Sequence, residues 1–225
     1  MKNYSVFDIL GPIMVGPSSS HTAGAARLGK IAAIIAGKNI ISVKFVLHGS
    51  FAKTYKGHGT DRALVAGILG MDPWDDRLKD SLAIAEKQGL KIEFAEGDLG
   101  DVHPNTVKFI ITKKNEKIVE VVGSSVGGGN ISIFKVDGQP VEFTGNYPTI
   151  IISHRDIPGM ISKVSTMLYD GNVNIAFMNV YRNSRGLKAA MVFETDTIVP
   201  ENVLSKIKSM DDIYSIREIS PVQRS

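Results

Sequence analysis

The chain has 225 residues, of which 43% are hydrophobic and 22% charged, and its formal net charge is +3. This composition is typical of a globular protein with room for two domains, and the small, mixed charge gives no support for nucleic-acid binding. The absence of cysteine excludes disulfides, thiolate catalysis and a cysteine-ligated iron–sulfur cluster held by this chain alone.

The histidine spacing and the apolar runs narrow the function classes further. The five histidines show no HExxH or comparable metal-ligand pattern, so we expect no metal bound by this chain alone. No apolar run approaches the roughly 18 residues of a membrane span, and residues 1–7 lack the apolar core of a signal peptide. We therefore expect a cytoplasmic protein with no membrane segment.

The first distinctive stretch is Gly16–Thr22, which places four hydroxyls and an imidazole in five consecutive residues. An apolar helical pattern follows and ends at Gly37, where a left-handed cap is usual. Ser19 or Ser20 is the expected N-cap, and the remaining amides and hydroxyls would face a small anion such as a carboxylate. A purely structural cap is the alternative, but a cap needs one hydroxyl and this turn offers four.

The second distinctive stretch surrounds His58, which Gly57 and Gly59 flank. A buried strand is predicted before it, at Ile40–Leu47, and a helix after it, at Arg62–Leu69, capped by Thr60 or Asp61. His21 and His58 therefore each lie in a turn that contains glycine, at the start of a predicted helix and next to hydroxyl or acidic side chains. The two turns together indicate one site. A histidine on a surface loop is the alternative for His58.

The remainder of the first 146 residues predicts further strands and one helix. The helix is expected at 77–88, and strands at 91–94, 107–112, 118–122 and 130–134. The stretch Gly123–Gly129 fits the G-x-S-x-G pattern of a hydrolase nucleophile, Ser125, but that motif must lead into a helix and here a strand follows. A bent glycine loop near a ligand and a plain glycine hairpin are both better interpretations.

The last third of the chain predicts a β-α-β-β-α-β unit after a turn cluster at 144–148. Its elements are expected at 149–154, 160–169, 172–181, 187–195, 200–210 and 213–219, with a turn at 183–186 between the two middle strands. Every break between these elements carries a turn signal.

The stretch His154–Ile161, followed by Asn172–Ile175, resembles an ACT domain, a small-molecule sensor that pairs with copies of itself. The resemblance implies a regulatory ligand held at an interface between copies. Its contacts would be His154, Asp156, Pro158 and Gly159 before the first helix, with Asn174 and Ile175 opposite. Asp156 stands where some serine-binding members have Asn, so an ionised carboxylate would repel a ligand carboxylate and attract its ammonium. An ACT fold used only for dimerisation is the alternative.

Five stretches, Ser5–Pro12, Gly16–Arg27, Tyr55–Asp61, His103–Thr106 and Gly127–Gly129, resemble the β chain of the iron–sulfur-dependent bacterial L-serine dehydratase. The resemblance implies an α/β (α+β) fold, with a mixed α/β domain of the allosteric-substrate-binding type at 1–146 and a ferredoxin-like ACT domain at 147–225. It also implies an α-chain partner whose cysteines hold a 4Fe-4S cluster, no cluster ligand on this chain, and no pyridoxal phosphate.

The reaction implied by this resemblance is the loss of water from L-serine, which yields pyruvate and ammonia. The open iron of the α chain would act as a Lewis acid on the leaving hydroxyl. We expect the substrate to be bound by hydroxyl and amide side chains, and a pair of histidines to donate hydrogen bonds or relay protons. The binding residues are Ser18, Ser19, Ser20, Thr22, Thr60 and Asn105; the catalytic residues are His21, His58 and Asp61, with Asp61 orienting His58. Either chain could supply the base that removes the α-proton.

Three other functions stay open at the level of the sequence. A non-catalytic amino-acid sensor would bind its ligand without a cysteine-rich partner. A serine hydrolase would label at Ser125 with a fluorophosphonate. A pure assembly subunit would tolerate replacement of Ser19 and His21.

Overall fold

The computed structural model describes residues 13–182 and 186–222, which form two compact units. Unit 1 comprises the chain up to Ile133 together with the segment from Val222 onward, and unit 2 comprises Phe134–Pro221. The stretch Ser5–Pro12 and most of the turn at 183–186 lie outside the described residues.

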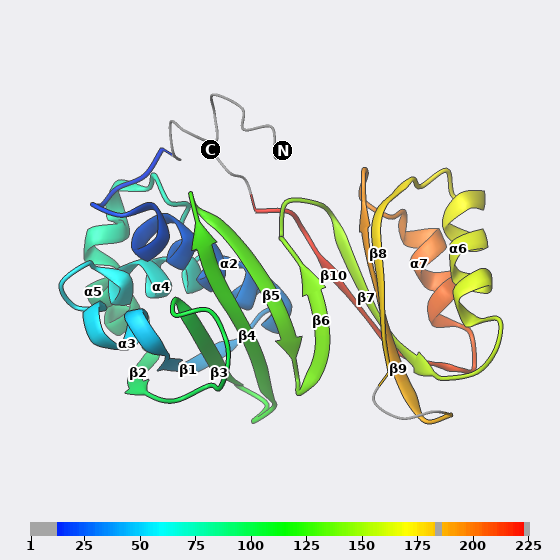
Figure 1. Cartoon of the computed structure of the whole chain (residues 1–225), viewed down its shortest axis with the longest axis horizontal. Helices are drawn as coiled ribbons and strands as arrows, with labels where there is room; N and C mark the ends of the chain where they lie inside the picture. The colour runs from blue at the N-terminus through cyan, green and yellow to red at the C-terminus, as the bar shows by residue number, and fades with distance from the viewer. Residues whose placement is uncertain (1–12, 183–185, 223–225) are drawn as a thin grey trace. The chain divides into compact units, whose positions relative to one another are not determined.

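Unit 1 is built from helices on one face of a sheet (Figure 1). Its helices, in chain order, are η1 (Ser19–Gly24), α2 (Ala25–Ala36), α3 (Gly49–Thr54), α4 (Thr60–Ile68), η2 (Asp76–Asp80) and α5 (Ser81–Lys87). Its strands are β1 (Ile40–Leu47), β2 (Lys91–Glu96), β3 (Thr106–Lys113), β4 (Ile118–Gly127) and the first half of β5 (Asn130–Val136). The full sheet has the strand order β2-β1-β3-β4-β5-β6, in which β1 pairs parallel with β2 and antiparallel with β3.

Two helices of unit 1, α2 and α4, cross at glycines. A Cβ built on Gly67 of α4 would lie 2.0 Å from the carbonyl oxygen of Ala26, and one built on Gly29 of α2 would lie 2.3 Å from the carbonyl oxygen of Leu64. Only hydrogen occupies these positions, so the two helix backbones pack directly against each other. The apolar faces of both helices are buried, and α2 also packs on β3 and β4.

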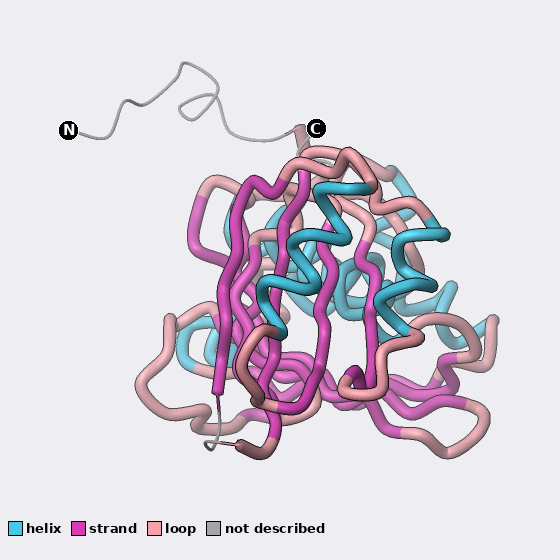
Figure 2. The backbone as a smooth tube through the Cα atoms, turned by 90° about the vertical axis from the view of Figure 1, so that its right-hand side faces the viewer, coloured by secondary structure: helices cyan, strands magenta, loops and turns pink. Residues whose placement is uncertain are grey.

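Unit 2 contains the predicted β-α-β-β-α-β arrangement. Its elements are β6 (Gln139–Phe143), β7 (Thr149–Arg155), α6 (Met160–Asp170), β8 (Ile175–Arg182), β9 (Lys188–Thr195), α7 (Glu201–Lys208) and β10 (Ile213–Ile219). The last four strands form an antiparallel sheet of order β10-β7-β9-β8, and Figure 2 shows α6 and α7 together on one of its faces. This arrangement confirms the predicted fold class.

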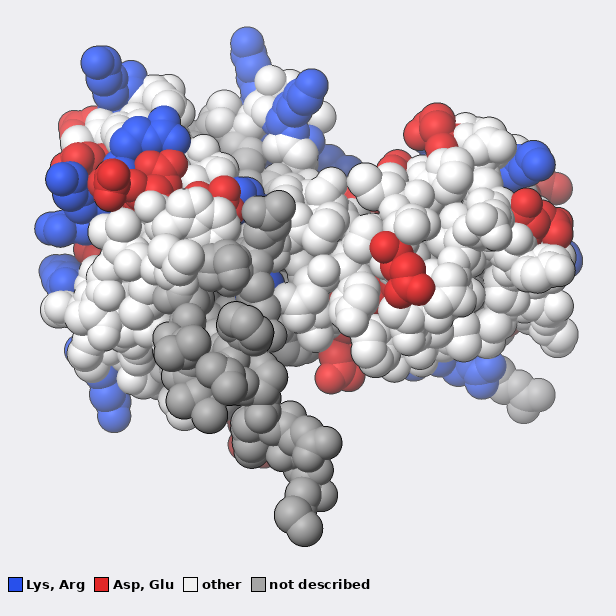
Figure 3. All heavy atoms as spheres, turned by 90° about the horizontal axis from the view of Figure 1, so that it is seen from above, with Lys and Arg blue, Asp and Glu red and all other residues white. Residues whose placement is uncertain are grey.

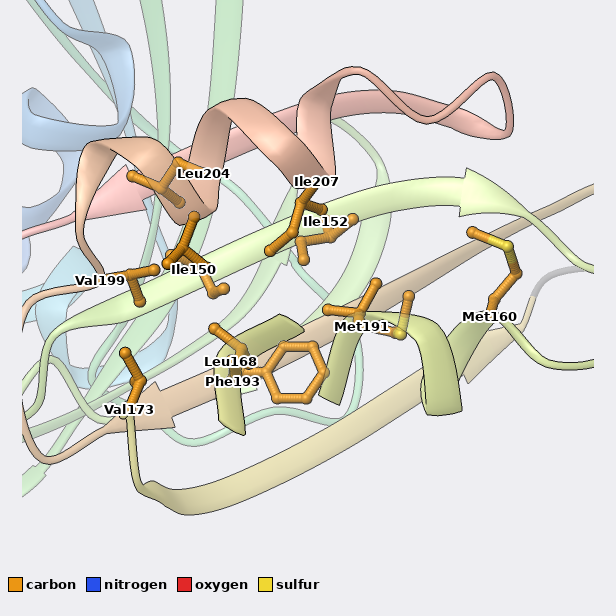
Figure 4. Packing of buried hydrophobic residues seen from close by; sticks show 12 residues of the cluster. Ile150, Ile152, Met160, Leu168, Val173, Met191, Phe193, Val199, Leu204 and Ile207 are labelled. Carbon is orange, nitrogen blue, oxygen red and sulfur yellow. The ribbon is translucent and has the colours of Figure 1, made fainter. Parts of the chain in front are cut away.

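The core of unit 2 lies between this sheet and its two helices. Inward-facing residues of β7 and β9, such as Ile152 and Phe193, meet Leu168 of α6 and Ile207 of α7 (Figure 4). All four side chains are buried. Every second residue of β7 and β9 therefore faces the helices, as a strand period of two requires.

The boundary between the units falls earlier than the predicted 146/147 division, within β5. The physical reason is that β6 packs on β8 and β9. Thr144, just after β6, also donates to the Glu194 carboxylate of β9 from both its backbone nitrogen (3.1 Å) and its hydroxyl (2.9 Å).

Several predicted bounds differ from the structure. The helix expected at 77–88 is a 3₁₀ turn, η2, followed by the shorter α5, and the strand expected at 118–122 continues to Gly127 as β4. The elements α3 and β6 were not predicted. On the face shown in Figure 3, acidic and basic side chains of the described residues are interspersed, as the small net charge suggests.

Candidate functional site

The hydroxyl-rich stretch Gly16–Thr22 forms a tight turn into a π-helical segment. The Ser18 Oγ caps the segment by accepting a hydrogen bond from the His21 backbone nitrogen (3.2 Å), so the predicted cap at Ser19 or Ser20 is wrong by one or two positions. The π-helix η1 then continues into α2 without a break. Such wide turns within helices are frequent at functional sites.

His21, on η1, is held by two serine hydroxyls and a phenyl ring. Its Nε2 is hydrogen-bonded to the Ser50 Oγ (3.2 Å), its Nδ1 lies 3.5 Å from the Ser18 Oγ, and Phe51 meets the imidazole edge to face at a centroid distance of 5.3 Å. Ser50 and Phe51 belong to α3, and their backbone nitrogens both donate to the Pro104 carbonyl (2.8 and 3.3 Å). Sequence reasoning missed Ser50 and Phe51, because α3 is too short to show a helical period.

His58, which comes from the turn before α4, lies against His21. The two imidazole centroids are 4.9 Å apart and the rings are inclined by 36°. His58 is exposed, and its Nδ1 lies 3.4 Å from the Thr54 carbonyl oxygen at the end of α3. The structure thus brings together the two glycine-marked histidine turns, as predicted from the sequence.

The electrostatics of this histidine pair favour a neutral His21. Burial lowers the pKa of His21 below its ordinary 6.5, and the neighbouring His58 lowers it further. A neutral imidazole can accept a proton at one nitrogen and donate from the other. A positive charge on His58 therefore disfavours a second positive charge on His21.

Asp61 does not take the predicted role of orienting His58. Its carboxylate accepts a hydrogen bond from the Arg62 backbone nitrogen (2.8 Å), and among the described residues it makes no hydrogen bond or ion pair with His58. The predicted cap at Thr60 or Asp61 is also wrong, because α4 begins after Gly59, which has a left-handed backbone with φ +69°.

The predicted binding hydroxyls fall into two groups. Ser18, Ser19 and Ser20 are half-buried at the start of η1, whereas Thr22 and Thr60 are only 2% and 0% exposed. The hydroxyls of both threonines are buried and have no hydrogen-bond partner among the described residues. The structure therefore keeps the three serines near the surface and places the two threonines in the core.

Asn105 lies beside α3 through its neighbour Pro104, whose carbonyl accepts from Ser50 and Phe51. The Asn105 backbone nitrogen donates to the His103 Nδ1 (3.1 Å), and its carbonyl accepts from Ser125 (3.0 Å). Its half-buried side-chain amide makes no hydrogen bond to another described residue.

Ser125 lies in the interior of β4 and does not form a nucleophile elbow. Its hydroxyl is buried without a hydrogen-bond partner among the described residues, and a Cβ built on Gly24 would lie 2.0 Å from it. The following glycines, Gly127 to Gly129, all have positive φ and turn the chain into β5. The structure thus contradicts the hydrolase alternative and confirms the glycine hairpin.

Arg27 connects three separate parts of unit 1, a role that the sequence pattern does not predict. It is 1% exposed on α2, its Nη1 donates to the Gly129 carbonyl (2.6 Å), and its Nη2 donates to the Val222 carbonyl (3.1 Å). A charged residue on an otherwise apolar helix face was the available signal. Arg27 therefore fixes the glycine hairpin and the segment after β10 to the helix that carries the site.

A separate pocket in unit 2 contains most of the predicted regulatory residues. It has a volume of about 960 Å³ and is lined by His154, Asp156, Pro158 and Gly159, together with Arg182 and Ser162. Asn174 and Ile175 do not line it, and Asn174 instead donates to the Asp196 carboxylate (2.6 Å). In one chain, therefore, four of the six predicted residues share one pocket.

The Asp156 carboxylate in this pocket is already paired. It accepts from the Gly186 backbone nitrogen (2.9 Å) and from the Arg182 guanidinium (2.9 and 3.0 Å), which together hold the pKa of Asp156 below its ordinary value. The expected repulsion of a ligand carboxylate is therefore offset by Arg182. His154 is buried, with its Nδ1 2.7 Å from the Arg155 carbonyl oxygen.

Two family models match the chain. The serine dehydratase beta chain model matches residues 5–135, and the ACT domain model matches residues 148–212. In the part of the chain that the structure describes, no helix is long and apolar enough to cross a membrane.

Three relatives illustrate the range of similarity. A probable L-serine dehydratase beta chain of Bacillus subtilis (strain 168) is 41% identical over 220 residues, which cover 98% of this chain and 100% of that protein. The L-serine dehydratase beta chain of Peptoniphilus asaccharolyticus is 44% identical over 212 residues, 94% of this chain and 96% of that protein. A D-3-phosphoglycerate dehydrogenase of Methanocaldococcus jannaschii is 28% identical over 202 residues, which cover 87% of this chain but 37% of that protein.

Proposed function

The chain belongs to the serine dehydratase beta chain family, and we propose that with an α chain it forms an L-serine dehydratase that converts L-serine to pyruvate and ammonia. It is the β subunit of this lyase. The near end-to-end match to chains of that name does not favour the alternative of a non-catalytic amino-acid sensor.

The iron–sulfur cluster of this enzyme is assigned to the α chain. This chain has no cysteine, and among its described residues no group of three His, Asp or Glu side chains could hold a metal ion. Its residues do not fit a 4Fe-4S cluster. Because the cluster is on the partner, turnover requires the α chain, and the β chain alone is inactive. No pyridoxal phosphate takes part.

The histidine pair supplies a proton path in this proposal. His21, kept neutral by burial and by its neighbour His58, exchanges a proton with the substrate. The exposed His58 exchanges that proton with solvent. Hydrogen bonds with the hydroxyls of Ser50 and Ser18 fix the orientation of the His21 ring. The contact between the two imidazoles is the observation that carries this role.

The substrate carboxylate is assigned to the start of η1. Ser19 and Ser20 are half-buried there and are not used as the cap, since Ser18 takes that role. The backbone amides at the start of η1 and the helix dipole of the continuous η1–α2 segment favour an anion at this end. The Asn105 amide is assigned to the same ligand, whereas Thr22 and Thr60 are assigned to the core because both are buried.

The experiment that tests the proposal is anaerobic co-expression of the two chains, followed by measurement of pyruvate formed from L-serine. His58→Ala should lower kcat at least tenfold while the assembly, measured by size-exclusion chromatography, stays intact. Lys53→Ala, which removes an exposed cation on α3, is the control and should leave both kcat and the assembly unchanged. Unchanged kinetics in an intact His58→Ala assembly would show that His58 is not part of the site. Turnover by the β chain alone would refute the proposal that the reaction requires the α chain.

The ACT unit is assigned a regulatory role in the same cytoplasmic enzyme. We propose that two copies associate through it and that a small amino acid binds beside Asp156 and Arg182, with its carboxylate on the guanidinium. Asn174 and Ile175 of the second copy would complete the pocket. Analytical ultracentrifugation with and without L-serine tests this assignment, since an unchanged monomer under both conditions would contradict it.

A further inference from the structure

A small cavity lies on the other face of the four-stranded sheet, away from α6 and α7. It has a volume of about 70 Å³, enough for a few water molecules or one small anion. Part of its lining comes from the end of β5, the turn that follows and the start of β6, between Val136 and Val141. Its polar lining residues are Asp137, Gln139, Ser153, Lys188, Ser215 and Arg217.

Strand register places Ser153 and Arg217 together on this face. Ser153 of β7 pairs with Ser215 of β10, and Arg217 is two residues further along β10, so it points to the same side as Ser215. Diagonal neighbours on adjacent strands are within reach of a long side chain such as arginine. The flanking Ile150 and Ile152 of β7 point to the opposite side, into the helix-covered core.

Two hydrogen-bond donors in this cavity have no acceptor among the described residues. Ser153 is 4% exposed, and its Oγ is buried without a partner. Arg217 pairs with the Asp137 carboxylate through its Nη2, which leaves its Nη1 buried and without a partner. Buried donors without acceptors are rare and costly, so each of them indicates a missing partner.

The charges of the lining residues indicate the sign of that partner. Asp137 is matched by Arg217, and Lys188 on the rim adds a second positive charge. Water could accept hydrogen bonds from the two donors but would leave the surplus of positive charge unbalanced. An anion would accept the hydrogen bonds and also balance the charge. A cation would meet two positive groups and one negative group.

We propose that this cavity binds a small oxyanion, such as phosphate or a short carboxylate, which accepts hydrogen bonds from the Ser153 Oγ and the Arg217 Nη1. The site is separate from the histidine pair of unit 1 and from the pocket beside Asp156. It does not depend on the catalytic proposal, because all of its residues belong to unit 2.

Isothermal titration of the full chain with inorganic phosphate and, separately, with sodium acetate tests the proposal, each against sodium chloride of equal ionic strength. At least one oxyanion should bind with a dissociation constant in the millimolar range or tighter, and the two titrations show which kind is preferred. Ser153→Ala should weaken that binding about tenfold, and Arg217→Gln should abolish it. Arg77→Gln, which removes an exposed arginine of unit 1, should leave it unchanged.

Two results would overturn the proposal. One is the absence of any heat beyond the chloride control; the other is binding that survives both Ser153→Ala and Arg217→Gln. If Arg217→Gln fails to fold, Ser153→Ala still decides the matter, because the Ser153 hydroxyl makes no hydrogen bond to the described residues whose loss would destabilise the chain.

Discussion

Replacement of Gly67 by alanine should destabilise unit 1, although alanine is the better helix former. The new Cβ would lie 2.0 Å from the Ala26 carbonyl oxygen, 2.6 Å from the Lys30 nitrogen and 2.8 Å from the Gly29 Cα, all of them backbone atoms of α2. Real Cβ contacts are essentially never shorter than 3.0 Å. The two helices must therefore separate by about 1 Å at their crossing, in a core packed too tightly to absorb the movement.

The magnitude follows from two opposing effects. Alanine gains about 1 kcal/mol over glycine inside a helix. Overpacking a core costs about 1 to 3 kcal/mol, and more when the obstacle is backbone rather than a side chain that can change rotamer. We take the cost at the upper end of that range, so the free energy of unfolding of unit 1 should fall by about 2 kcal/mol.

The single tryptophan, Trp74, reports on this change directly because it is half-buried in unit 1. In urea unfolding followed by its fluorescence, the midpoint should fall by about 1 M with the slope unchanged. Gly57→Ala is the matched control, since a Cβ there would have 3.8 Å to its nearest neighbour, the Thr54 carbonyl oxygen. A Gly67→Ala midpoint equal to or above that of the wild type would refute the direct contact between the helices.

Three further predictions test single contacts. His58→Ala should raise the pKa of His21 toward 6.5 in an NMR titration. Because the pKa of His21 is lower in the folded than in the unfolded protein, the free energy of unfolding falls as the pH drops below 6.5. This fall should be smaller in His58→Ala than in the wild type. Ser125→Ala should raise the urea-derived free energy of unfolding by about 1 kcal/mol, since it deletes a buried hydroxyl without a partner, and a fall would contradict that environment. Arg182→Gln should raise the pKa of Asp156 only in part, because the hydrogen bond from Gly186 is the larger cause and remains; an unchanged value by carbon NMR would mean that the ion pair does not form.

The fold of unit 2 was predictable because its signals are local. Gly159, with φ +88°, starts α6, and Pro200 precedes the first residue of α7. In contrast, α3 was missed because it depends on a distant partner. The whole of α3 has 6 residues, too few to show a helical pattern. The backbone amides of Ser50 and Phe51 donate to the carbonyl of Pro104, which is more than fifty residues away in the chain.

The helix caps of unit 1 show how tertiary contacts choose among equivalent local signals. Three adjacent serines offer the same hydroxyl, and Ser18 is the one whose hydroxyl accepts from the His21 backbone nitrogen. Asp61 was assigned to His58 from proximity in the sequence, but the adjacent Arg62 amide is nearer and takes its carboxylate. Sequence spacing thus indicated which turns carry polar side chains but not the hydrogen-bond partner of each.

The helices that follow the two histidine turns meet at residues that carry no chemistry. His21 precedes α2 and His58 precedes α4, and further along the same helices Gly29 and Gly67 let the two backbones touch. A glycine inside a helix costs about 1 kcal/mol relative to alanine, so two of them in neighbouring helices need a compensating contact. Both glycines were visible in the sequence within apolar helical patterns, where they indicate a close helix crossing. Had the crossing been inferred first, α2 and α4 would have been placed side by side, with the first half of α2 against the last turns of α4.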